Sequence, residues 1–268
     1  MSGNEREVLL QQPATCLDPA APIAEVTIGR ALFTAPNLLG GQAERASISC
    51  ASCHSNGRRN PSFFLAGISA EPGSADVSSS FFSLARANGK FDPRQIPDLA
   101  QPGKVSRDPA SGVLEAFIRG LIVEEFSGRE PTGRELAGLA TYVRAIRACP
   151  DKGTEPLTLA SDLELVQTSI SAASVLAKRG DLQGAAVAAK GARYRLGLIS
   201  ERFAGQQNSG LRAGLSTASR NLAAQPLQAK ALSAWLSAFD RDLVPKLKRA
   251  KRRSLYDGRS LERWLSER

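Results

Sequence analysis

The chain has a single histidine, and this histidine closes the pattern Cys50-Ala51-Ser52-Cys53-His54. Two thiols three positions apart, followed directly by an imidazole, form the attachment signature of a c-type haem. The thiols can form thioethers with the two vinyl groups on one porphyrin edge, and the imidazole can be the proximal iron ligand. We therefore predict one covalent haem c, attached to Cys50 and Cys53, with His54 as the iron ligand.

Two other interpretations of the cysteine pair remain open. A structural zinc site would need further ligands, and the other two cysteines, Cys16 and Cys149, lie far away in the sequence. A thioredoxin-like redox pair would need a βαβ context, and no such pattern is visible. Haem attachment is the first hypothesis, with zinc and redox chemistry as alternatives.

Length and charge predict two domains. A chain of 268 residues is long enough for one large domain or two small ones. Residues 1–150 carry 15 Lys and Arg against 15 Asp and Glu, whereas residues 151–268 carry 20 against 11 and hold the whole net charge of +9. No apolar run is long enough for a transmembrane segment. Composition also excludes fibrous and wholly disordered proteins.

Helical patterns flank the motif on both sides. Residues 27–33 place Gly29 and Phe33 on one helix face. Thr132 and Glu135 form a capping box that opens a second helix, whose apolar stripe contains Tyr142. This arrangement resembles the class I cytochrome c fold, in which an N-terminal helix with a glycine and an aromatic residue crosses the C-terminal helix. The resemblance implies that Gly29 and Tyr142 lie at such a crossing.

The middle of this region resembles one branch of the same fold more closely. The stretch Gly-Lys-Phe-Asp-Pro-Arg-Gln-Ile-Pro-Asp-Leu at residues 89–99 is similar to the G-x-F-D-x-P-x-L-R segment of the di-haem cytochrome c peroxidase family. Residues 114–118 fall where that family has its T-L-x-x-V helix, and the resemblance spans about residues 25–147. Two departures matter: the chain has one haem motif, and Arg107-Asp108-Pro109 stands where the family often has His-Asp/Asn-Gly. Peroxidase activity is therefore not carried over.

The same resemblance implies a disulfide and an exported protein. Cys16 precedes the first helix of the haem domain and Cys149 follows the last, so a crossing of these helices would bring the thiols within bonding range. Covalent haem attachment in this family occurs outside the cytoplasm, which implies a periplasmic or otherwise exported location. The N-terminal residues lack the pattern of a signal peptide, so we expect the export signal to lie outside this sequence.

The sixth iron position has no obvious ligand. Met1 is the only methionine and no second histidine exists, so the position is open, water-filled or taken by an unusual donor. The resemblance puts the distal loop near residues 101–109, where Lys104 is the nearest donor, provided that it loses its proton. Arg107 is a candidate for a haem propionate or distal contact. Tyr142 is a second candidate ligand, although packing is the better interpretation of its position.

An open iron site would admit a small ligand such as peroxide, nitric oxide, carbon monoxide or oxygen. Peroxide cleavage also needs an acid or base, and Glu124 and Glu125 follow the distal segment in the sequence. We expect these to be two exposed helix carboxylates.

The C-terminal half predicts a helical bundle. Apolar and small residues recur at helical spacing on several faces, including Leu163 to Ala173 and Ala185 to Leu196. Residues 246–253 carry six positive charges in eight positions. Such a run is typical of a solvated helix end, or of a surface that docks an acidic protein or an anionic membrane.

Together these patterns predict an all-α protein, with a cytochrome c-like haem domain followed by a separate antiparallel helical bundle. The expected boundaries are an N-terminal extension at 1–15, a mono-haem domain at 16–150 and a basic bundle at 151–268. The expected function is one-electron transfer to or from a protein redox partner, with no nucleic-acid partner. The candidate for this partner is an acidic protein that docks on the bundle. A peroxidase-like or ligand-binding enzyme, and a haem-based sensor or assembly module, remain alternatives.

Overall fold

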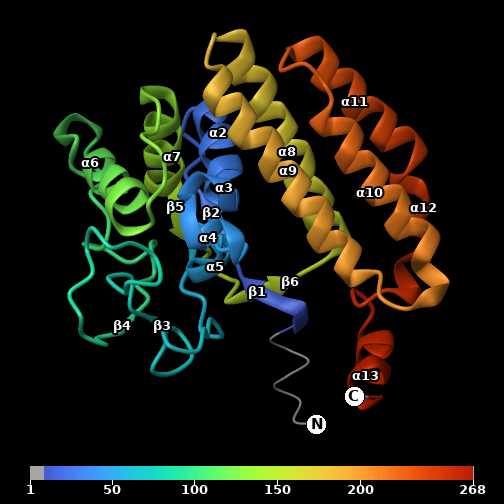
Figure 1. Cartoon of the computed structure of the whole chain (residues 1–268), viewed down its shortest axis with the longest axis horizontal. Coiled ribbons are helices and arrows are strands. Elements are labelled where there is room, and N and C mark those ends of the chain that lie inside the picture. Colours follow the sequence, from blue (N-terminus) through green and yellow to red (C-terminus); the bar gives the residue numbers. More distant parts are fainter. Residues whose placement is uncertain (1–8, 268) are drawn as a thin grey trace. The chain divides into compact units, whose positions relative to one another are not determined.

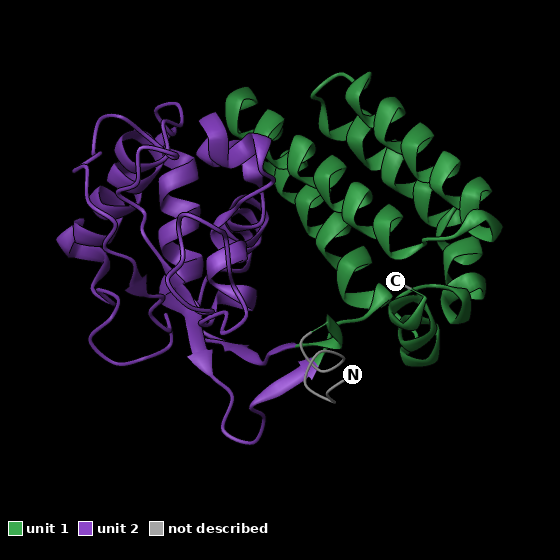
Figure 2. Cartoon of the chain, turned by 60° about the horizontal axis from the view of Figure 1, so that its bottom comes forward, with its two compact units in different colours: residues 1–11, 156–268 green, residues 12–155 purple. Residues whose placement is uncertain are grey.

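A computed structural model describes residues 9–267, so Met1 and half of the expected N-terminal extension lie outside the described residues. The described chain is mainly helical with a few short strands, as the sequence predicts (Figure 1). It divides into two compact units (Figure 2). The motif unit comprises Gln12–Glu155, and the helical unit comprises residues 156–267 with residues 9–11. The expected boundaries lie within a few residues of this division.

The motif unit contains short helices joined by long irregular segments. Its elements are β1 (Gln11–Pro13, which begins in the helical unit), β2 (Thr15–Leu17), α2 (Ile23–Phe33), α3 (Pro36–Leu39), α4 (Gly41–Arg45), α5 (Cys50–Cys53), η1 (Ser55–Gly57), β3 (Ser74–Ala75), β4 (Arg94–Gln95), η2 (Pro109–Ser111), α6 (Val113–Gly120), the π-helical turn η3 (Leu121–Glu125), α7 (Gly133–Ala145), β5 (Ile146–Ala148) and β6 (Thr154–Pro156, which ends in the helical unit). The strands form three two-stranded pairs, β1–β6, β2–β5 and β3–β4.

Helices α2 and α7 cross at glycines. A Cβ atom placed on Gly29 would lie 2.1 Å from the carbonyl oxygen of Gly138 and 2.5 Å from Cβ of Tyr142. A Cβ on Gly138 would in turn lie 2.6 Å from a methyl group of Ile28. Only hydrogen atoms fit between the two backbones here, so both glycines are needed for this contact. Gly29 and Tyr142 meet as expected, whereas Gly138 is a participant that the sequence analysis did not single out.

The start of α7 is the predicted capping box. The Thr132 N–H donates to the Glu135 carboxylate at 2.7 Å, and the Glu135 N–H donates to the Thr132 hydroxyl at 3.1 Å. The Glu135 side chain is completely buried, and the Arg129 guanidinium pairs with it. This ion pair compensates the buried charge and holds the segment before α7 in place.

Residues 58–112 form a long segment with little regular structure. Only the two-residue strands β3 and β4 and the single turn η2 interrupt it. Irregular segments of this length are uncommon in compact domains and are usually either functional or linker segments. Several large apolar side chains on this segment and on the adjoining α6 are exposed: Phe64, Val77, Phe81, Leu84, Phe91, Val113 and Phe117.

A disulfide joins the two ends of the motif unit. Strand β2 pairs antiparallel with β5, with Cys16 opposite Arg147. This register brings Cys16 and Cys149 into a disulfide with a Cα–Cα distance of 5.1 Å, across a sequence separation of 133. The pairing is the one that the cytochrome resemblance implies.

The helical unit contains α8 (Leu159–Lys178), α9 (Leu182–Arg202), η4 (Gln206–Asn208), α10 (Ser209–Ala223), α11 (Ala229–Asp242), α12 (Val244–Ala250), η5 (Lys251–Arg253) and α13 (Gly258–Ser266). Helices α8 to α11 lie side by side and alternate in direction (Figure 1). Among the described residues, no helix combines the length and apolar character that crossing a membrane requires.

Small residues allow α8 and α9 to pack closely. The predicted faces of both helices are buried, with Ala173, Ala185, Ala188 and Ala192 completely inaccessible to solvent. The turn between the helices depends on Gly180, whose φ of +79° lies in the left-handed region. The next residue, Asp181, caps α9 by accepting a hydrogen bond from the Gly184 N–H at 2.9 Å.

A buried polar network attaches the C-terminal segment to the first two helices of this unit. The Tyr256 hydroxyl donates to Asp162 on α8 at 2.5 Å, and Arg195 on α9 donates to the other carboxylate oxygen at 3.0 Å. Burial, followed by the Asp162 charge, raises the pKa of Tyr256. The Arg202 guanidinium lies 5.6 Å from the centre of the Tyr256 ring. The segment that follows α12 is therefore held firmly against α8 and α9.

Candidate functional site

Cys50 and Cys53 lie on the single helical turn α5. The turn is capped by a box between Ser49 and Ser52, in which the Ser49 N–H donates to the Ser52 hydroxyl at 3.0 Å. Residues three apart on a helix share one face, so the two side chains project in related directions. Both are free thiols, whereas the other two cysteines form the disulfide. The structure therefore keeps the C-x-x-C pair available for another partner.

The surroundings of this pair disfavour its thiolate forms. Burial raises the pKa of Cys50 to about 12, and burial together with the neighbouring Cys50 raises the pKa of Cys53 to about 12. Reactive C-x-x-C pairs need the opposite, a lowered pKa that produces thiolate at neutral pH. Nor do any three His, Cys, Asp or Glu side chains converge as a metal site anywhere in residues 9–267. The raised pKa values disfavour a reactive redox pair; haem attachment and zinc binding stay predictions.

His54 follows directly at the end of α5, where its N–H donates to the Cys50 carbonyl at 2.9 Å. The imidazole packs against Phe33 with ring centroids 6.3 Å apart. Burial lowers the pKa of His54 to about 4, although the Pro97 carbonyl and the Asp98 charge act in the opposite direction. At neutral pH the ring is therefore uncharged, the state in which an imidazole can ligate a metal. Its Nδ1 is buried and has no hydrogen-bond partner within the described residues.

An ion pair connects the motif to the loop that faces the imidazole. The Arg58 guanidinium donates two hydrogen bonds to the Asp98 carboxylate, each at 2.6 Å, and a third to the Ala14 carbonyl at 3.1 Å. Each side chain of the pair is only 18% exposed. Because Asp98 directly follows Pro97, the pair holds the Pro97 carbonyl in the region of His54.

Tyr142 lies beside the motif from the other direction. Its ring packs edge-on against Phe33 at 5.3 Å, and a Cβ on Gly57 would lie 3.5 Å from its hydroxyl oxygen. Burial raises the pKa of Tyr142 to about 12, so the phenol stays protonated. Phe33 thus contacts both the imidazole of His54 and the phenol of Tyr142, which links the helix crossing to the motif. This position agrees with a packing role for Tyr142.

The two residues expected from the distal loop differ in their surroundings. Lys104 is exposed in an irregular turn. Arg107 donates to the carbonyls of Val143 and Arg144 at 2.7 Å each, and to the Leu99 carbonyl at 2.6 Å. Both terminal nitrogens of Arg107 are thus used to join the end of α7 to the loop after Pro97. Orphan carbonyls at a helix end attract a guanidinium, which explains these bonds. The expected propionate or distal contact of Arg107 stays a prediction.

Glu124 and Glu125 lie on the π-helical turn η3 and differ in exposure. Glu124 accepts a hydrogen bond from Arg86 at 2.5 Å and is 40% exposed, whereas the Glu125 side chain is 16% exposed. The expectation of two exposed helix carboxylates is therefore wrong for Glu125. One of its oxygens is buried without a hydrogen-bond partner within the described residues, and burial raises the pKa of Glu125. Short π-helical turns are frequent at functional sites.

The motif unit contains residues that could hold a haem c. Two adjacent free thiols share one helical turn, and a neutral imidazole with an unpartnered buried nitrogen follows them. Elsewhere in the same unit, the irregular segment 58–112 and α6 expose apolar side chains; Phe64 is 57% exposed and Leu84 is 83% exposed. A flat apolar macrocycle would shield such side chains from water. The residues present therefore fit the group.

Sequence patterns did not predict a role at this site for Arg58, Pro97 or Asp98. Pro97 and Asp98 belong to the stretch similar to the di-haem peroxidase family, but nothing in the pattern pairs Asp98 with Arg58.

Comparison with protein-family models, curated proteins and solved structures finds no match for this chain.

Proposed function

We propose that residues 16–150 form a mono-haem cytochrome c domain, similar to one half of a di-haem cytochrome c peroxidase, and that the chain transfers single electrons to or from a protein partner. The observation that carries the proposal is the uncharged, partly buried imidazole of His54, directly after the turn that holds two free thiols. In this proposal the basic helical bundle that follows is a docking domain. The Cys16–Cys149 disulfide supports an exported, periplasmic location, because disulfides persist in oxidising compartments.

Each residue of the motif has a defined task. Cys50 and Cys53 would hold the haem through thioethers, and His54 would ligate its iron. The haem supplies an iron that gains or loses one electron. Phe33 keeps the imidazole in place from one side, while the Arg58–Asp98 pair anchors the loop that carries Pro97. Burial keeps His54 free of a competing proton at neutral pH.

Mass spectrometry of the exported, matured chain tests this proposal. We expect the mass of one haem to be retained after denaturation in acid and organic solvent. The double variant Cys50→Ala with Cys53→Ala should lose this covalent mass, whereas Ser52→Ala, within the same turn, should retain it. Unmodified mass for the wild-type chain, matured in a host with a working haem-attachment system, would overturn the proposal.

The second candidate function is peroxidase-like or other small-ligand chemistry at the haem. The specific observation that favours it is Glu125, a half-buried carboxylate with a raised pKa and an unpartnered oxygen. A carboxyl with a raised pKa keeps its proton to a higher pH than an exposed one does, which suits a general acid. Turnover of peroxide with a reduced electron donor separates this candidate from a carrier. If the chain is an enzyme, Glu125→Gln should abolish turnover, whereas Glu130→Gln, at an exposed position beyond η3, should leave it unchanged.

A further inference from the structure

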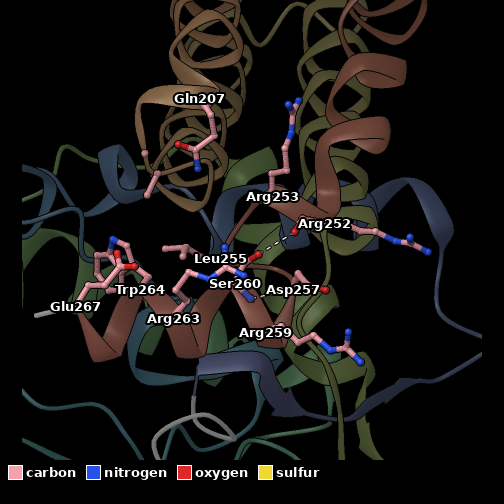
Figure 3. A pocket seen from close by; sticks show the side chains of 12 residues that line it. Gln207, Arg252, Arg253, Leu255, Asp257, Arg259, Ser260, Arg263, Trp264 and Glu267 are labelled. Carbon is pink, nitrogen blue, oxygen red and sulfur yellow. Dashed lines mark hydrogen bonds between the residues drawn. The ribbon is translucent and has the colours of Figure 1, made fainter.

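The helical unit contains a hollow of about 960 Å³ that lies away from the haem motif in the sequence. The loop around η4 forms one wall, and η5 and α13 form the others (Figure 3). Its polar and aromatic lining includes Gln207, Arg252, Arg253, Arg259, Arg263 and Trp264. A volume of this size is large enough for several side chains of another molecule.

Positive charge dominates this hollow. All four of its arginines are exposed, and none of their guanidiniums has a hydrogen bond or ion pair within the described residues. By contrast, Arg195 and Arg241 elsewhere in the same unit are paired with carboxylates. Of the two acidic residues in the lining, Asp257 is used as the N-cap of α13, accepting from the Ser260 N–H at 3.1 Å. The guanidiniums are therefore available to an incoming anion.

The walls of the hollow are held by hydrogen bonds. Asn208 donates to the Arg253 carbonyl at 2.8 Å, and the Leu255 N–H donates to the Arg202 carbonyl at 2.7 Å. The Ser260 hydroxyl donates to the Arg252 carbonyl at 2.8 Å, and Figure 3 shows Arg252 and Arg259 extending to the same side of this bond. The buried Tyr256–Asp162 bond anchors the same segment. Such preorganisation lowers the entropy cost of binding.

Charge continues beyond the hollow along the preceding helix. Four further exposed cations precede it in the chain: Lys246, Lys248, Arg249 and Lys251. A single phosphate or carboxylate would engage only part of such a surface, whereas an extended polyanion would engage all of it.

The shape favours a polypeptide over a lipid surface. A flat bilayer cannot enter a concave site, and surface-binding segments also insert large apolar side chains. The exposed large apolar residues of the helical unit are Leu182 and Leu198, both on α9. Arginine forks match the geometry of carboxylates and bind them bidentately.

We propose that the hollow between η4 and α13 binds an acidic segment of the protein partner, with Arg252 and Arg259 pairing with its Asp or Glu side chains. This inference rests on the proposed function in one respect: it takes the bound protein to be the redox partner. Binding itself uses the helical unit and needs no haem.

Fluorescence anisotropy with the full-length protein and a labelled peptide of eight glutamates tests the inference. We expect binding at low ionic strength that weakens steeply as salt is added, and no binding of the matching glutamine peptide. The double variant Arg252→Ala with Arg259→Ala should weaken binding about tenfold. The control Arg220→Ala with Lys230→Ala removes two exposed charges beside the turn between α10 and α11, and should have a much smaller effect. Figure 1 shows this turn at the opposite end of the bundle from α13.

Equal losses in both double variants would overturn the inference, because they would show attraction by net charge alone. The inference would also be overturned if the protein bound phosphatidylserine vesicles or single-stranded DNA more strongly than the glutamate peptide, and if Arg252→Ala with Arg259→Ala abolished that binding. The hollow would then bind that polyanion. Circular dichroism checks that both variants stay folded. Because haem content is measured separately by mass, the inference and the proposed function can fail independently.

Discussion

Arg58 and Asp98 form an ion pair joined by two hydrogen bonds. Arg58 lies four residues after His54, the only histidine, and Asp98 directly follows Pro97, whose carbonyl faces the imidazole. The pair connects two segments 40 residues apart and is largely shielded from water. Its position supports the imidazole, which an exposed surface ion pair would not do. The pair thus links the stability of the loop to the environment of His54.

Removing the Asp98 charge should destabilise the motif unit. Asp98→Asn leaves the Arg58 guanidinium without its anion, and we expect a loss of about 1–3 kcal/mol in the free energy of unfolding. Asp151→Asn, at an exposed position in the same unit, should change it by less than about 0.5 kcal/mol. Urea unfolding measures both. In the haem-loaded protein the same change should raise the reduction potential, because a negative charge near His54 favours ferric iron.

The same pair should also make the fold acid-sensitive. Burial alone would raise the pKa of Asp98, but the hydrogen bonds from Arg58 and the Ala100 N–H lower it overall. A carboxyl with a lowered pKa contributes stability above its ordinary pKa of 3.8, and this contribution is lost as the pH falls below that value. The difference in stability between wild type and Asp98→Asn should therefore shrink in strong acid. A difference that stays constant down to pH 2 would contradict this account.

The lowered pKa of His54 should make the stability of the haem-free protein depend on pH in a second, separate range. Its pKa is lowered from 6.5 to about 4, so between these values the unfolded chain binds a proton that the folded chain does not. Stability should therefore fall as the pH drops through this window, with this group contributing a slope of up to about 1.4 kcal/mol per pH unit. His54→Gln should remove that component, which is measured by urea unfolding at a series of pH values. As the chain has no other histidine, an unchanged slope would refute the prediction.

Gly29→Ala should disrupt the crossing of α2 and α7. The new methyl group would lie 2.1 Å from a backbone oxygen, and backbone atoms cannot move aside as a flexible side chain can. We expect a loss of about 3 kcal/mol or more in the free energy of unfolding. Gly120→Ala is the matched control, because its Cβ would meet nothing within 4 Å, and it should be neutral or slightly stabilising. Thermal unfolding of the two variants distinguishes them.

Loss of the Cys16–Cys149 bridge should lower stability without changing the motif. The bond closes a loop across 133 positions, for which removal costs about 2–5 kcal/mol. Cys16→Ser with Cys149→Ser is the variant to compare with wild type by chemical unfolding. Thiol titration of the denatured, unreduced haem-free protein should find only Cys50 and Cys53 reactive. Four reactive thiols would show that the bridge does not form.

Local patterns were sufficient wherever neighbouring residues decide the structure. The capping box at Thr132 and Glu135 and the buried faces of α8 and α9 followed from spacing alone, because helix periodicity and end-capping are local. The predicted exposure of Glu125 is wrong because a local pattern assumes a regular α-helix. The π-helical turn rotates its side chain away from the direction that α-helical spacing indicates, and a sequence pattern does not show that rotation.

The sequence by itself determined the helical class and the motif of two cysteines and one histidine, since both depend on residues close together in the chain. Only the tertiary structure decided which groups surround that motif. It paired Arg58 with Asp98, used Arg107 to close the end of α7, and brought Gly138 against Gly29. These contacts join segments far apart in the chain, and they form only where packing removes water and a polar group must find a new partner.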